Sequence, residues 1–207
     1  MADKQTISIK KKTLRIYSIS AIVIIIAVLG YYFFFHNPSF SIISTSNPAT
    51  IKNLEAKFAV LSKTNTNSCG GTFDYVDSMP DNARIQGSCC SAMNFHRYEE
   101  QIKGLKKYKK YDLIPKDPYD ISVSLAKELL DFQKNIKLDS EQQKIYDKSV
   151  ELSHEGGPCC CKCWHWYAYE GLAKYLIVEE NFTAEQIAEV WDISDACGGD
   201  GHAGGGH

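Results

Sequence analysis

An uninterrupted apolar segment constrains this chain more than any other feature. Residues 14–35 read LRIYSISAIVIIIAVLGYYFFF, with no charged residue after Arg15. At a rise of ~1.5 Å per residue, about 20 apolar residues cross a hydrocarbon core of about 30 Å. A secretory signal peptide has a shorter apolar core, of about 7–15 residues, and a small-residue cleavage site, which is absent after this segment. We therefore expect residues 14–35 to be an uncleaved transmembrane anchor.

The distribution of charge orients this anchor. Of the 23 basic and 25 acidic residues, residues 1–35 hold five and one, which leaves 18 and 24 for the remainder. The basic residues precede the anchor, so residues 1–13 are expected to be a cytoplasmic tail and residues 36–207 to lie outside. The acidic remainder argues against a nucleic-acid partner, which requires a positive surface. The expected partners are the lipid bilayer, through residues 14–35, and a protein in the same membrane.

Helical patterns dominate the outer part of the chain. Residues 36–47 resemble a polar stalk, residues 48–197 a helical domain, and residues 198–207 a flexible tail of glycine and histidine. Helices are predicted to begin at Pro48 and to cover residues 89–107, 121–132, 139–153, 158–178 and a segment from Thr183. Residues 62–87 form a predicted loop, and no strand-like run of convincing length occurs. The predicted fold class is all-α, a single N-terminal transmembrane helix followed by a small bundle of five to six helices.

Two of these helices have a recognisable start. Asp139 is followed three residues later by Gln142, and Thr183 by Gln186. In such a capping box the first side chain accepts a hydrogen bond from the backbone of the third residue of the helix, whose own side chain bonds back. Both pairs therefore predict helix N-termini.

Eight cysteines are concentrated in two matching segments of the outer domain. The sequence Cys89-Cys90-x-x-Met93 is repeated in form by Cys159-Cys160-x-x-Cys163, and both segments lie at predicted helix starts. On a helix, the positions i, i+4 and i+7 share one face. This spacing adds His96 to the first segment, and it pairs Cys161 with His165 in the second.

This donor set favours binding of a soft metal. A helix N-terminus stabilises the thiolate, which is the form that binds metals. Thiolate, thioether and imidazole suit Cu(I), and thiolate with imidazole suits Zn(II) or an iron–sulfur cluster. A copper or zinc ion, or an iron–sulfur cluster, is therefore the expected cofactor. The candidate ligands are Cys89, Cys90, Met93, His96, Cys159, Cys160, Cys161, Cys163 and His165.

Two other uses of the thiols remain open. Cysteines outside the cytoplasm commonly form disulfides, which would make the domain a stapled interaction module, with Cys69 and Cys197 as one candidate pair. Cys160-x-x-Cys163, with a lysine between, also has the form of a thiol–disulfide oxidoreductase motif. The favoured function is a metal chaperone, sensor or electron-transfer accessory. Hydrolytic or transferase chemistry is not expected, because the chain has no P-loop, G-x-S-x-G or H-E-x-x-H motif.

One short segment resembles a known motif. Residues 158–163 read PCCCKC and are similar to the Pro-Cys-Tyr-Cys-Gly-Cys motif of a family of exported bacterial proteins, with Cys160 in place of tyrosine and Lys162 in place of glycine. The resemblance covers six residues and implies no particular activity.

Overall fold

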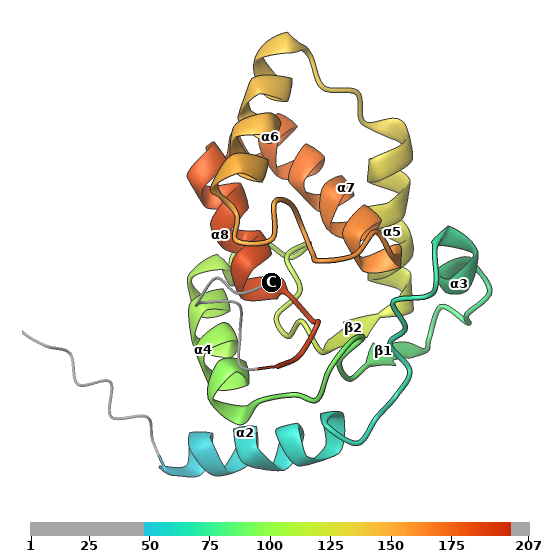
Figure 1. Cartoon of the computed structure of the whole chain (residues 1–207), viewed down its shortest axis with the longest axis vertical. Coiled ribbons are helices and arrows are strands. Elements are labelled where there is room, and N and C mark those ends of the chain that lie inside the picture. The colour runs from blue at the N-terminus through green and yellow to red at the C-terminus, as the bar shows by residue number, and fades with distance from the viewer. Residues whose placement is uncertain (1–47, 200–207) are drawn as a thin grey trace, which may run out of the picture. The chain divides into compact units, whose positions relative to one another are not determined.

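The computed structural model describes residues 48–199, which belong to one compact unit (Figure 1). In chain order its elements are α2 (Pro48–Leu61), α3 (Phe73–Asp77), β1 (Arg84–Gln86), α4 (Phe95–Leu105), the 3₁₀ turn η1 (Lys106–Tyr108), β2 (Asp120–Ser122), α5 (Val123–Asn135), α6 (Ser140–Leu152), α7 (Trp164–Val178) and α8 (Ala184–Ser194). The described part is mostly helical, as predicted.

The main core lies around α7. This helix packs most extensively on α5, and the two lie side by side in Figure 1, while α6 packs on α8. The close approach of α5 and α7 depends on Gly171, because a Cβ atom there would lie 1.9 Å from the carbonyl oxygen of Leu129. Trp164 and Trp191 are fully buried in this core. Burial of aromatic side chains of this size is a large apolar contribution to stability.

Local capping signals set the starts of α6 and α8. The side chains of Asp139 and Gln142 form a complete capping box at α6. Thr183 and Gln186 form the second box at α8. Both predicted helix starts are therefore confirmed.

Two other predicted helix starts are wrong. Helix α4 begins at Phe95, where the side chain of Asn94 accepts a hydrogen bond of 3.0 Å from the backbone of Arg97. Helix α7 begins at Trp164 rather than at Pro158. Most of the cysteines therefore lie in loops before the helices, and not on helical faces.

A small antiparallel sheet, which the sequence did not predict, contributes Ile85 and Ile121 to the main core. Strands β1 and β2 pair with Ile85 opposite Ile121. A second cluster of buried side chains, beside α2 and α4, contains Leu61, Tyr98 and Tyr119. Strand β1 leads directly to the first cysteine segment, so this sheet fixes where that segment begins.

The predicted cytoplasmic tail (residues 1–13), anchor (14–35) and stalk (36–47) lie outside the described residues, as do residues 200–207 of the tail predicted at 198–207. Gly199, the last described residue, donates its N–H to the carbonyl of Ala92 at 2.7 Å. Within residues 48–199, no helix has the length and apolar character needed to cross a membrane.

Candidate metal centre

All eight cysteines lie in segments between or beside the helices. Cys69 follows α2, and Cys89 and Cys90 lie between β1 and α4. The residues between α6 and α7 carry four more, namely Cys159, Cys160, Cys161 and Cys163. Cys197 follows α8. The cluster is thus assembled from four separate parts of the chain.

Backbone hydrogen bonds between these segments hold the cysteines together. The N–H of Cys89 donates to the carbonyl of Ala196 at 3.1 Å, and the N–H of Ser91 donates to that of Cys197 at 2.8 Å. Gly198 has a φ of +83°, and a Cβ atom there would lie 2.2 Å from the Ser91 carbonyl oxygen. Only glycine fits this crossing without strain. The segment after α8 is therefore locked against the Cys89–Cys90 segment.

The start of α7 holds a third segment in place, the one that contains Cys69. The N–H of Trp164 donates to the carbonyl of Gly71 at 2.8 Å, and its indole Nε1 donates to the side chain of Asn67 at 3.0 Å. These bonds place Cys69, which lies between the two acceptor residues, beside the cysteines that precede α7.

The sulfur atoms are close together but not bonded. Cys197 Sγ lies 3.2 Å from Cys159 Sγ and 3.2 Å from Cys160 Sγ. Cys89 Sγ lies 3.5 Å from Cys90 Sγ and 3.9 Å from Cys197 Sγ. A disulfide bond is about 2.05 Å long. All eight cysteines lie in the described part of the chain, and every one is a free thiol.

The thiols form four groups of three. In each group, the three sulfur atoms lie within 4.8 Å of one another. These groups are Cys69–Cys90–Cys161, Cys89–Cys90–Cys197, Cys159–Cys160–Cys197 and Cys159–Cys161–Cys163. Successive groups share a sulfur, so the eight cysteines form one continuous cluster that could bind metal.

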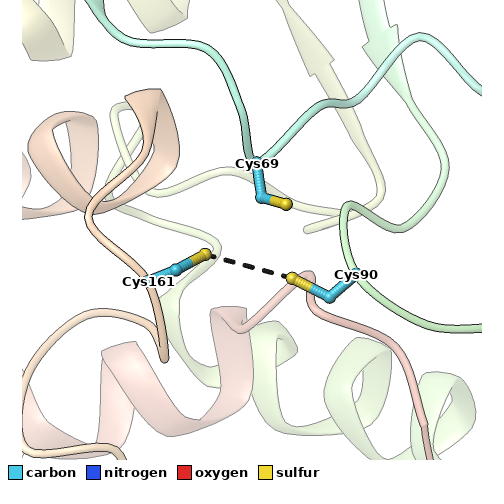
Figure 2. A group of neighbouring side chains, drawn as sticks. All are labelled: Cys69, Cys90 and Cys161. Carbon is cyan, nitrogen blue, oxygen red and sulfur yellow. Dashed lines mark hydrogen bonds between the residues drawn. The ribbon is translucent and has the colours of Figure 1, made fainter.

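Burial varies across this cluster. Cys159, Cys163 and Cys197 are buried, at most 2% exposed, whereas Cys69 and Cys90 are exposed. Figure 2 shows Cys69, Cys90 and Cys161 reaching toward one another from three segments, with Cys90 Sγ and Cys161 Sγ 4.0 Å apart. The cluster thus has a buried side and a solvent-accessible side.

Cys163 is the thiol best prepared to ionise. Its pKa is lowered to about 6, first by a hydrogen bond from the Cys159 thiol, and further by the backbone N–H groups of Trp166 and His165, while burial opposes the shift. Cys163 is the N-cap residue of α7, where the helix dipole favours a thiolate. This single cysteine retains the helix-start role that the sequence suggested for a whole segment.

Several other thiols are held neutral in the metal-free protein. The pKa of Cys159 is raised, chiefly through its thiol contacts with Cys163 and Cys197 and then through burial. Burial is the first cause of the raised pKa of Cys161, to which the neighbouring thiolates add. Crowded thiols resist ionisation until a cation offsets the charge.

The three other predicted ligands lie apart from the four thiol groups. Met93 is buried in the second cluster, beside Tyr98 and Ala196. The His96 side chain is 79% exposed and its Nε2 lies 3.2 Å from Glu100. These positions follow from the later start of α4, which removes the helical face that Met93 and His96 were expected to share with Cys89.

His165 is fully buried, and its ring stacks on Tyr169 with centroids 4.2 Å apart. Burial lowers the pKa of His165 to about 4, against the opposing effect of the Asp195 carboxylate. The imidazole is therefore neutral at physiological pH, and it lies within the core beside the cluster rather than in one of the thiol groups.

Cys69 and Cys197 do not form the disulfide pair that the sequence suggested, and both are free thiols. The two share no group: Cys69 lies with Cys90 and Cys161, whereas Cys197 lies with Cys159 and Cys160 in one group and with Cys89 and Cys90 in another. An isolated cysteine in a loop carries no local pattern, so only the tertiary hydrogen bonds identify these two as members of the site.

No protein-family model, curated protein or solved structure matches the chain.

Proposed function

We propose that this protein binds a soft metal ion at its cysteine cluster and passes it to or from a partner, as a chaperone anchored outside the cytoplasm by residues 14–35. The observation that carries this proposal is that eight free thiols from four segments form one cluster. Crowding eight thiols contributes little to packing, whereas a bound cation would turn the same arrangement into a stabilising contact.

The variation in burial supports metal exchange rather than a closed structural site. A purely structural site encloses its metal. Here Cys69 and Cys90 are exposed, so thiols of a partner can approach and replace one ligand at a time, while Cys159 and Cys163 keep the metal shielded from water.

Thiol–disulfide exchange is less well supported. A nucleophilic cysteine must be both accessible and ionised at neutral pH. Cys163 has the lowered pKa but is only 1% exposed. Cys160 is exposed, but burial of part of its side chain, with the neighbouring Cys90, raises its pKa against the opposing hydrogen bond with Cys197.

The test is metal content together with a thiol count. The full-length protein is purified anaerobically in detergent, offered Cu(I), Zn(II) or iron with sulfide in separate samples, and desalted. We expect a metal to stay bound and all eight thiols to react with a thiol reagent after its removal. A metal-free protein whose thiols are all paired in disulfides would instead establish the stapled interaction module.

A further inference from the structure

The four thiol groups share sulfur atoms, and this sharing indicates which metal species they bind. Each group offers three sulfurs, so the four groups offer twelve ligand positions, yet the chain supplies eight cysteines. Cys90, Cys159, Cys161 and Cys197 each belong to two groups, and Cys69, Cys89, Cys160 and Cys163 to one. Four bridging and four terminal sulfurs account for all the positions.

We infer that the cysteines hold one cluster of four Cu(I) ions, each three-coordinate, joined through the sulfurs of Cys90, Cys159, Cys161 and Cys197. This inference rests on the proposed function and specifies the metal and its number. Binding is an acid–base step without redox change: each cysteine that still carries a proton gives it up to solvent as its sulfur forms one or two bonds to copper.

The sulfur distances fit this coordination. With metal–sulfur bonds of about 2.3 Å, sulfurs around a trigonal ion lie about 4.0 Å apart. Cys90 and Cys161 are separated by 4.0 Å and Cys89 and Cys197 by 3.9 Å. The 3.2 Å separations at Cys197 require a small opening of the loops when a metal enters.

The distances disfavour an iron–sulfur cluster, and the number of sulfurs in each group disfavours structural zinc. An iron–sulfur cluster carries its own sulfide ions between the cysteine sulfurs, which need a wider cage than thiols that are 3.2–4.0 Å apart provide. Structural zinc takes four ligands in a tetrahedron. The groups here contain three sulfurs and no imidazole.

Sharing sulfurs also lowers the electrostatic cost of the cluster. Four separate three-coordinate sites would need a thiolate for every ligand position, and each thiolate adds a negative charge to a partly buried region. A sulfur that bridges two Cu(I) ions supplies two bonds with one charge. Since burying uncompensated charge is costly, a bridged cluster suits these thiols better than isolated sites.

Substitution of single cysteines tests this inference. A bridging and a terminal cysteine can be compared at the same exposure, so that only the number of groups to which each belongs differs. Cys90 and Cys160 are both exposed, but Cys90 is a bridging position and Cys160 a terminal one. Cys161 and Cys89 are a second such pair, both of intermediate exposure. Serine is a poor ligand for Cu(I), so Cys→Ser at a bridging position removes a ligand from two ions and at a terminal position from one.

The full-length protein in detergent is titrated anaerobically with Cu(I) against a chromophoric Cu(I) chelator, and X-ray absorption reports copper neighbours. We expect four Cu(I) per chain with copper–copper scattering, two for Cys90→Ser and Cys161→Ser, and three for Cys160→Ser and Cys89→Ser. Circular dichroism of each metal-free variant verifies that it is folded.

The outcomes separate this inference from the function on which it rests. One Cu(I) per chain, copper without copper–copper scattering, or equal losses within each matched pair would overturn the cluster while leaving soft-metal binding intact. Retention of Zn(II) that excess Cu(I) does not displace would do the same. A protein that binds no metal at all would overturn both.

Discussion

The helical end of the domain, formed by α5 to α8, and the thiol end, formed by the four cysteine segments, are held in different ways. At the helical end, buried side chains such as Leu129 and Leu172 pack between helices that approach as closely as Gly171 allows. At the thiol end, backbone hydrogen bonds such as Cys89 N–H to Ala196 join irregular segments. Apolar packing dominates at one end, and the other end brings together sulfur atoms that a metal ion would join.

Trp164 lies where the two ends meet. Its side chain is fully buried in the main core, while its backbone and indole N–H groups bond to Gly71 and Asn67 of the Cys69 segment. The position of the thiol end therefore depends on the helical end, and we expect the helical end to fold without metal. The predictions below test that asymmetry.

The largest expected effect comes from Gly171→Ala, which breaks the helical end. The added Cβ would lie 1.9 Å from the Leu129 carbonyl oxygen and 2.7 Å from the Gln133 nitrogen, and neither backbone atom can move easily. We expect the free energy of unfolding to fall by about 3 kcal/mol. Urea denaturation followed by tryptophan fluorescence measures it, since all three tryptophans lie between residues 164 and 191.

Gly70→Ala is the matched control at the thiol end. A Cβ there would meet only the Ser68 hydroxyl oxygen, at an ordinary contact distance of 3.7 Å. We expect a change within about 0.5 kcal/mol. If both substitutions destabilised the protein equally, the close approach of α5 and α7 would not be what sets its stability.

Metal binding should stabilise the thiol end more than the helical end. At a free Cu(I) concentration of about 30 times the dissociation constant, a ligand that binds only the folded state adds about 2 kcal/mol. Hydrogen exchange followed by mass spectrometry, with and without Cu(I), should show the largest gain in protection in residues 87–94, 158–163 and 195–199. An equal gain throughout α5 and α6 would show that metal orders the whole domain instead.

Acid should loosen the sheet that leads to the Cys89–Cys90 segment. Burial alone would raise the pKa of Asp120, but hydrogen bonds from Arg84, Lys57 and Gln86 outweigh it, so the pKa lies below its ordinary value. The unfolded chain therefore takes up the proton first. The stability that Asp120 contributes is complete above about pH 4 and is lost as the pH falls through its folded pKa.

Asp120→Asn tests this assignment. Arg84 and Lys57 are roughly half exposed, so solvent screens the interaction, and we expect a loss of about 1 kcal/mol at neutral pH. The variant should also lose the part of the acid dependence that Asp120 supplies, measured as unfolding free energy from pH 7 to pH 3. An unchanged acid dependence would assign it to other carboxylates.

The sequence predicted what local interactions determine. The Asp139–Gln142 and Thr183–Gln186 boxes lie within single turns, and both mark real helix starts. Helix α7 begins instead where the Trp164 N–H meets the Gly71 carbonyl, a partner far away in the chain. No local pattern contains that bond.

The two strands could not be predicted for a related reason. Arg84–Gln86 and Asp120–Ser122 are three residues each, too short to show an alternating pattern. The cysteine cluster shares this property, because its segments are joined by bonds such as that between Ser91 and Cys197. The residue types suggested the chemistry, and the tertiary bonds determine which thiols meet.

The smallest expected effect tests the sequence prediction that the structure does not support. His96 was expected to share a helical face with Cys89, but it lies 79% exposed on α4 beside Glu100. An exposed side-chain contact of this kind contributes less than about 0.5 kcal/mol. We expect His96→Ala to leave both the unfolding free energy and the number of Cu(I) ions bound unchanged, as measured by urea denaturation and chelator competition. A lower copper count would mean that the segment before α4 becomes helical when metal binds, bringing His96 onto the face of Cys89.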